Sequence, residues 1–208
     1  IIADRVLLTH RPRRRSAPSG SSAAMALLKF IRALPRKIAN RMTMLLFAIL
    51  LPLERVLFRY SLVGHTELLD AARFPWAGEL EANWRLIRAE LDQVMLHRDS
   101  APNYLDLSDD AAGLTERDNW KSFFFHAYGV PVPDNCARCP ETARLLGRID
   151  GMKSGFFSIM LPGTRLKPHR GHFAGVLRYH LGLRIPDVEA CGLRVGTHVV
   201  HWEEGKSL

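Results

Sequence analysis

The sequence predicts an α+β fold in which helices come first and antiparallel strands follow. Apolar residues recur at helical spacing up to about residue 96, whereas after Gly151 short apolar segments alternate with turn residues. Short strands at this spacing are typical of an antiparallel barrel or double-sheet roll. The 208 residues, 47% of them hydrophobic, suffice for one domain with its own core and an appendage.

The positive charge of the chain is concentrated near its N-terminus. Residues 1–60 contain twelve of the 29 Lys and Arg residues but only Asp4 and Glu54 among the 21 acidic ones, a net charge of +10. The rest of the chain therefore carries 17 basic and 19 acidic side chains, a net charge of −2. A near-neutral globular part argues against nucleic acid as a partner.

Residues 1–24 are predicted to form a disordered basic tail. The segment 11–24 is rich in Arg, Ser, Pro and small residues and has no apolar period. Met25 could also be the natural start of the chain.

Residues 25–63 form an amphipathic and apolar segment that we expect to associate with a membrane. Its uncharged part, residues 42–53, would be about 18 Å long as a helix, which is shorter than the ~30 Å hydrocarbon core. Interfacial or re-entrant attachment is therefore favoured over a full span. No convincing cleavage site for a signal peptide follows. A buried helix of the soluble domain remains the alternative.

The domain proper is predicted to contain helices and strands in succession. A surface helix is expected over residues 75–96, a strand over 122–130 and a short helix over 140–147. The later strands are expected over residues 154–161, 165–169, 174–183, 191–196 and 198–205.

The three cysteines are too few for a disulfide framework and suit a reducing compartment. Cys136 and Cys139 have CxxC spacing, but no second CxxC or His pair completes a zinc site. A structural turn is therefore favoured over a metal or redox role.

Alternation in the segment 174–183 places Arg178 and His180 on one face and Leu177, Tyr179 and Leu181 on the other. The apolar face should pack on a core. The face with Arg178 and His180 is either a cationic pocket suited to a dicarboxylate or an exposed polar surface, and alternation leaves both open.

His169 is a candidate metal ligand because a neutral imidazole binds Fe(II), Zn or Cu. A 2-His-1-carboxylate site would normally have an acidic residue two positions later, where this chain has Gly171. From the spacing alone, a structural role for His169 is favoured.

Several ordered motifs nevertheless resemble the aspartyl/asparaginyl β-hydroxylase family, over roughly residue 79 to the end, and its bacterial lipid A hydroxylase branch most closely. Gly171 matches the position at which this family lacks the usual carboxylate. The motifs are Asn119-Trp-Lys, Asn135-Cys-x-x-Cys-Pro-Glu-Thr, Ser158-Ile-Met-Leu-Pro-Gly-Thr, Pro168-His-x-Gly, Leu177-Arg-x-His-Leu-Gly-Leu-x-x-Pro, Cys191-x-Leu-Arg-Val-Gly and Trp202-x-Glu-Gly-Lys.

The resemblance implies a dioxygenase domain over residues 75–208, with N-terminal helices followed by an incomplete double-stranded β-helix, or jelly-roll, core. It also implies dependence on Fe(II), 2-oxoglutarate and O₂. His169 matches an iron ligand, and Ser158, Arg178 and His180 match residues that bind 2-oxoglutarate. Trp120 matches a side chain that lines the pocket near the substrate entrance.

The family pattern continues past the Glu-Gly-Lys turn with a second iron-binding His and an Arg for the far carboxylate of 2-oxoglutarate. This sequence ends at Leu208, and His172, His198 and His201 do not match the second ligand. We therefore expect a C-terminally truncated chain with negligible turnover of its own.

The resemblance implies hydroxylation of an unactivated C–H bond, with lipid A fatty acyl chains as the favoured substrate. The basic, apolar N-terminus supports a lipid at a membrane surface. Hydroxylation of Asp or Asn side chains in proteins is the alternative, and a non-catalytic membrane-tethered binding module is the alternative of another class. We expect a membrane-associated protein whose domain faces the cytoplasm.

Overall fold

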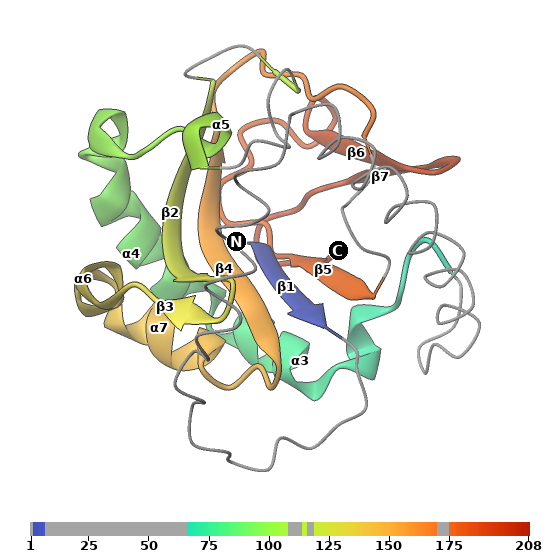
Figure 1. Ribbon diagram of the computed structural model, residues 1–208. Helices are drawn as coiled ribbons and strands as arrows, with labels where there is room; N and C mark the ends of the chain where they lie inside the picture. The colour runs from blue at the N-terminus through green and yellow to red at the C-terminus, as the bar shows by residue number, and fades with distance from the viewer. Residues whose placement is uncertain (1, 7–65, 108–113, 116–118, 170–174) are drawn as a thin grey trace, which may run out of the picture. The chain divides into compact units, whose positions relative to one another are not determined.

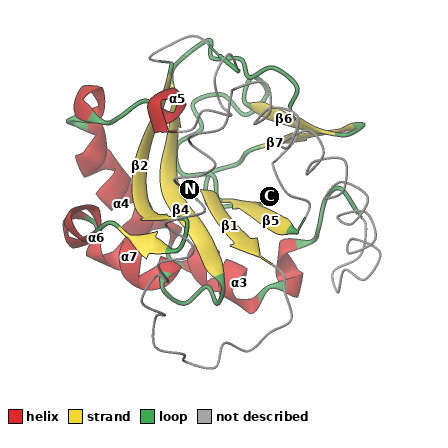
Figure 2. Ribbon diagram, in the orientation of Figure 1, coloured by secondary structure: helices red, strands yellow, loops and turns green. Residues whose placement is uncertain are grey.

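The computed structural model describes residues 2–6, 66–107, 114–115, 119–169 and 175–208 (Figures 1 and 2). The predicted membrane segment, residues 25–63, and most of the predicted disordered tail lie outside these ranges. Within the described ranges, no helix is both long and apolar enough to cross a membrane.

The predicted helix over residues 75–96 is two helices, α3 (Pro75–Ala82) and α4 (Trp84–Met95). They meet at Asn83, whose side-chain amide donates to the Glu79 carbonyl at 2.8 Å. An Asn side chain that competes for backbone groups favours such a break. The other helical elements are η1 (Ala71–Arg73), η2 (Arg98–Ser100), α5 (Tyr104–Leu107), α6 (Pro133–Arg138) and α7 (Pro140–Leu146).

The described strands form a five-stranded sheet in the order β3-β2-β4-β1-β5 and a separate two-stranded hairpin, β6-β7. All of their pairings are antiparallel, so the expected mixture of helices and antiparallel sheets is confirmed. The bounds are β1 (Ile2–Val6), β2 (Trp120–Ala127), β3 (Val130–Pro131), β4 (Met152–Met160), β5 (Val176–His180), β6 (Gly192–Val195) and β7 (His198–His201).

The prediction of a strand over residues 165–169 is wrong, because these residues belong to no strand or sheet. The Lys167 N–H donates to the Leu114 carbonyl, and Pro168 has no N–H to offer a ladder. His169 thus lies in a loop.

Strand β1 differs from the disorder expected over residues 1–24. Its backbone pairs with β4 on one side and with β5 on the other, so that it lies between them in the sheet (Figure 1). Both partners are more than a hundred residues away in the sequence, and composition around residue 4 therefore carries no sign of the pairing.

One face of the sheet packs against helices α3, α4 and α7. Phe125 of β2 and Phe157 of β4 are almost completely buried there, against Leu80 and Ile87 of the helices. Burial of an apolar side chain of this size stabilises a fold by about 1.5–3 kcal/mol. Tyr179 and Leu181 belong to the same core, which confirms the apolar face predicted for β5.

Glu90 of α4 holds the N-terminal end of α7. Its carboxylate accepts hydrogen bonds from the Glu141 N–H at 2.9 Å, the Thr142 N–H at 2.8 Å and the Thr142 hydroxyl at 2.6 Å. Thr142 is completely buried, so these donors have no water to replace the carboxylate. Glu90 therefore fixes the segment that contains the cysteine pair.

Cys136 and Cys139 lie where their thiols pack against the core of the domain. Cys139 is fully buried in the core, and desolvation, with the Glu90 charge adding to it, raises the pKa of its thiol to about 12. The Cys136 thiol donates to the Phe125 carbonyl at 3.4 Å. A buried thiol that stays protonated is a poor nucleophile and metal ligand, in agreement with the structural turn expected from the spacing.

Replacement of Glu90 by Gln should lower the free energy of unfolding by about 1–3 kcal/mol, because a neutral amide leaves buried donors of α7 without a charged acceptor. Urea denaturation measures the effect. Glu141→Gln is the matched control, since Glu141 forms an exposed ion pair with Arg144 and should change stability by less than about 1 kcal/mol. Equal losses in the two variants would contradict the assigned role of Glu90.

Candidate functional site

The sheet face opposite the helical core carries most of the side chains predicted to form the site. Ile2 of β1 pairs with both Phe156 and His180, so these two residues lie on the same face. Ser158 follows Phe156 by two residues, and Arg178 precedes His180 by two. Ser158, Arg178 and His180 consequently share a face, as alternation predicted for the latter two.

Trp120 belongs to this face as well, since it pairs with Met160, two residues after Ser158. Its indole N–H donates to the Ser158 hydroxyl oxygen at 2.8 Å, and the side chain is only 6% exposed. Tyr104 of α5 stacks on the indole with ring centroids 4.0 Å apart. A hydroxyl that accepts from Trp120 keeps its own hydrogen for another acceptor.

Tyr104, Trp120, Phe124 and Phe156 form an aromatic wall over this part of the sheet. Phe124 and Phe156 stack with centroids 4.5 Å apart, and Tyr104 lies 5.6 Å from Phe156. The sequence predicted Trp120 as a pocket residue but did not reveal Tyr104, because its partners lie on strands remote from α5 in the sequence. The wall lines one side of the half-buried Ser158.

Ser122 is a second hydroxyl on the same face, directly opposite Ser158 across β2 and β4. It is completely buried, and its oxygen has no hydrogen-bond partner among the described residues. A buried hydroxyl without a hydrogen-bond partner destabilises the folded state by about 1–3 kcal/mol, so such groups are rare in folded proteins. The sequence signal was weak: a serine at the start of an otherwise aromatic strand.

His180 is held by its backbone and by a tryptophan. Its N–H and carbonyl both pair with Leu208, at 2.9 and 2.8 Å. The indole N–H of Trp202 donates to His180 Nδ1 at 3.3 Å. Burial lowers the pKa of His180 to about 3, and the positive charge of Arg178 adds to the effect. The imidazole is therefore neutral at physiological pH.

Arg178 supplies the permanent positive charge of this face. Its side chain is exposed at the end of the sheet that bears His180. A guanidinium presents several N–H donors in a fixed plane and binds carboxylates with two parallel hydrogen bonds. Arg178 and neutral His180 together provide one cationic and one neutral group for an anionic ligand.

His169 is exposed, and its Nδ1 lies 2.8 Å from the Lys167 carbonyl oxygen. A carbonyl only accepts, so Nδ1 carries the hydrogen and Nε2 keeps a lone pair, as in most metal-binding histidines. No hydrogen bond joins His169 to Ser158 or His180 in the described part of the chain. The described residues also contain no group of three His, Cys, Asp or Glu side chains suited to a metal.

The other histidines near the C-terminus agree with the surface roles expected for them. His201 is exposed, with Nδ1 2.8 Å from the Val188 carbonyl, and exposed His198 lies 3.9 Å from the Glu67 carboxylate. His172 lies outside the described residues.

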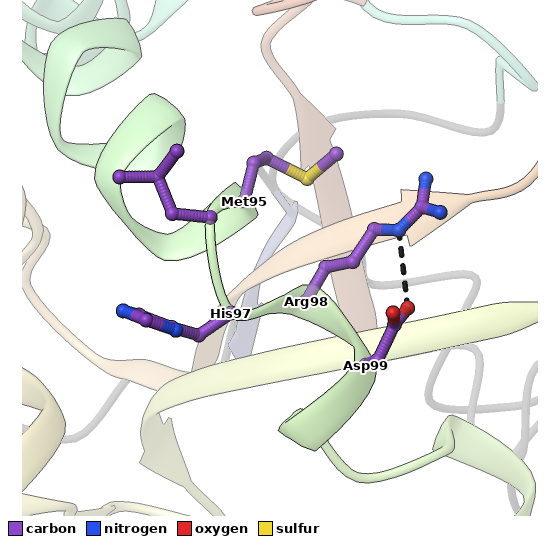
Figure 3. A pocket seen from close by; sticks show the side chains of 5 residues that line it. Met95, His97, Arg98 and Asp99 are labelled. Atoms are coloured by element: carbon purple, nitrogen blue, oxygen red, sulfur yellow. Dashed lines mark hydrogen bonds and ion pairs between the residues drawn. The ribbon is translucent and has the colours of Figure 1, made fainter.

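A surface hollow at the end of α4 is separate from this site (Figure 3). It is lined by the consecutive residues 95–99, among them the ion pair of Arg98 and Asp99 at 3.1 Å. None of the predicted site residues lines it, and its lining comes from the end of α4, the following turn and η2. The hollow is a feature of the turn after α4.

The chain resembles known hydroxylases over most of its length. An ornithine lipid ester-linked acyl 2-hydroxylase of Rhizobium tropici is 35% identical over 204 residues, which cover 97% of this chain and 73% of that protein. The aspartyl/asparaginyl beta-hydroxylase of Mus musculus is 37% identical over 150 residues, 70% of this chain but only 18% of that protein.

The family comparison agrees with these relatives. The sequence model described as aspartyl/asparaginyl beta-hydroxylase matches residues 81–208 and thus includes Trp120, Ser158, His169, Arg178 and His180. The match confirms the resemblance that the ordered motifs indicated. This chain belongs to the aspartyl/asparaginyl beta-hydroxylase family.

Proposed function

We propose that this protein is an Fe(II)- and 2-oxoglutarate-dependent dioxygenase that hydroxylates the fatty acyl chain of a polar membrane lipid. The observation that carries the proposal is the common face of Ser158, Arg178 and His180, opposite the helical core. The antiparallel sheet and hairpin are compatible with part of a double-stranded β-helix.

The spacing of these residues suits a dicarboxylate. Ser158 and His180 lie on β4 and β5, which are separated by β1 and hence by about 10 Å across the sheet. A ligand that lies over β1 can receive a hydrogen bond from the Ser158 hydroxyl at one side and from Arg178 and His180 at the other. The charge of Arg178 is the strongest attraction for a carboxylate in this arrangement.

His169 would hold the metal through Nε2, while the Lys167 carbonyl fixes its ring orientation through Nδ1. Bound Fe(II) would supply the activation of O₂ that inserts one oxygen atom into an unactivated C–H bond while 2-oxoglutarate is converted to succinate and CO₂. The aromatic wall lines the Ser158 side of the site. Trp120 would line the substrate side while it orients Ser158.

A lipid acyl chain is favoured as the substrate because the relative that matches nearly the whole chain is named for an ornithine lipid. Lipid A, the substrate favoured from the sequence, belongs to the same chemical class. The basic N-terminal segment supports attachment to an anionic membrane surface, with the domain on the cytoplasmic side.

Hydroxylation of Asp or Asn side chains in proteins is the second candidate. The relatives named for that reaction match 70% of the chain. A binding module without redox chemistry would keep the anion-binding face but consume no O₂.

The substrate class can be tested with a protein extended past Leu208 to include the second iron-binding His and the Arg of the family pattern. This protein is incubated with Fe(II), 2-oxoglutarate and O₂ in the presence of ornithine lipid, lipid A or an Asp/Asn-containing peptide. Mass spectrometry should detect the gain of one oxygen atom on an acyl chain, with an equal amount of succinate. Oxidation of the peptide alone would select the second candidate. Binding of 2-oxoglutarate without any oxidised product would favour the binding module.

Replacement of Arg178 by Ala should weaken 2-oxoglutarate binding by about 10- to 150-fold, because a hydrogen bond to a charged group contributes about 1.5–3 kcal/mol. Isothermal titration calorimetry provides the dissociation constant. Arg184→Ala is the matched control, since exposed Arg184 lies just past β5 and, among the described residues, contacts the Asp92 carboxylate at 3.9 Å. Unchanged binding by the Arg178 variant would contradict the assigned cosubstrate site.

His180 should make the protein sensitive to acid. In the folded chain the imidazole has a pKa of about 3, below its ordinary 6.5. Between these two pH values the unfolded chain binds a proton at His180 and the folded chain does not. His180 therefore does not lower the free energy of unfolding above pH 6.5, and lowers it increasingly as the pH drops toward 3. The free energy of unfolding between pH 7 and 4 should fall less steeply in His180→Gln. Identical pH slopes in the two proteins would rule out a neutral, buried His180.

A further inference from the structure

Trp202 follows strand β7 and reaches from the hairpin to the five-stranded sheet. Its backbone N–H donates to the Cys191 carbonyl at 3.3 Å, while its indole N–H donates to His180 Nδ1 at the same distance. The two ring planes are nearly parallel, 9° apart, with centroids separated by 5.9 Å.

The direction of this hydrogen bond determines the hydrogen position on His180. An indole N–H only donates, so Nδ1 must accept. A neutral imidazole carries one hydrogen, which must then be on Nε2. Among the described residues, Nε2 has no hydrogen-bond partner, so its N–H is available to a ligand.

The other tautomer would be unsuited to an anionic ligand. With the hydrogen on Nδ1, the indole N–H would meet another donor, and Nε2 would present a lone pair to the ligand. A lone pair repels a carboxylate oxygen, whereas an N–H binds it. The indole therefore decides whether neutral His180 attracts or repels a carboxylate.

The segment around Trp202 is anchored to the helices, so the indole has a fixed position. The Glu204 carboxylate accepts from Arg88 of α4 at 3.0 Å and from the Ile185 N–H at 3.1 Å. Gly205 lies against Trp84, where an added Cβ would come within 2.7 Å of the indole nitrogen. This anchoring holds the indole beside His180.

We propose that Trp202 is a positioning residue that fixes His180 in the Nε2–H tautomer, so that the neutral imidazole donates a hydrogen bond to a carboxylate of the ligand. The identity of that ligand as 2-oxoglutarate rests on the proposed function. The tautomer itself does not.

Nitrogen-15 NMR of the imidazole tests the tautomer directly, because protonated and unprotonated ring nitrogens differ widely in chemical shift. In the full wild-type chain at pH 7, His180 should have Nε2 protonated and Nδ1 unprotonated. Trp202→Phe keeps an aromatic ring but removes the N–H, and should produce a mixture of the two tautomers. A wild-type His180 protonated at Nδ1 would overturn the proposal without the need for any variant.

Binding provides the second readout. The dissociation constant of 2-oxoglutarate should rise about 2- to 10-fold in Trp202→Phe, as expected for the loss of one neutral hydrogen bond. The melting temperature should stay close to that of the wild type. Tyr128→Phe is the control, since this aromatic side chain is 80% exposed in the turn between β2 and β3 and should leave both the tautomer and the binding unchanged.

The two proposals fail in different ways. A wild-type protein that binds no 2-oxoglutarate would contradict the proposed function, while the NMR comparison still decides the role of Trp202. A Trp202→Phe protein with wild-type affinity and an unchanged His180 tautomer would overturn the positioning role.

Discussion

Burial of Tyr179 and Leu181 against the helices is the interaction on which the candidate site depends. Side chains of a strand alternate between its faces, so these two residues oblige Arg178 and His180 to point away from the core. A slip of one residue in the pairing of β5 would exchange the two faces and bury the guanidinium among phenylalanines. The apolar core thus decides the orientation of polar groups that it does not contact.

The second half of the face follows the same rule on a different strand. Phe157 and Ile159 of β4 are buried in the core, and Ser158 between them points to the opposite side. There the aromatic wall lines one side of the half-buried Ser158, and the Trp120 indole N–H donates to its hydroxyl oxygen. The Ser158 hydroxyl offers an anion an uncharged hydrogen bond at one end of the face. The exposed Arg178 guanidinium offers it a positive charge at the other end.

Sequence reasoning succeeded where structure depends on local periodicity. Most helices and strands after residue 75, the apolar face of α4 and the two faces of β5 follow from spacing within ten to twenty residues. Sequence reasoning failed where a single residue, or a partner far away in the sequence, determines the bounds of an element or its place in a sheet. Asn83 divides one expected helix into two, Pro168 lies in a segment that joins no sheet, and β1 pairs with strands far along the chain. The contact of Trp202 with His180 and the burial of the Ser122 hydroxyl also depend on residues far apart in the sequence, so the sequence did not predict them. Only the family motifs predicted Ser158, His169, Arg178 and His180 as members of one site, because spacing arguments treat each segment separately.

The central claim is that the face bearing Ser158, Arg178 and His180 binds 2-oxoglutarate. Titration of the ¹⁵N-labelled full chain with 2-oxoglutarate, followed by NMR, tests it most directly. The account predicts saturable shift changes at the amides of Ser158 and Arg178 and at the imidazole of His180, with much smaller changes in α4 and α7. Changes confined to other parts of the chain, such as the hollow formed by residues 95–99, would contradict it.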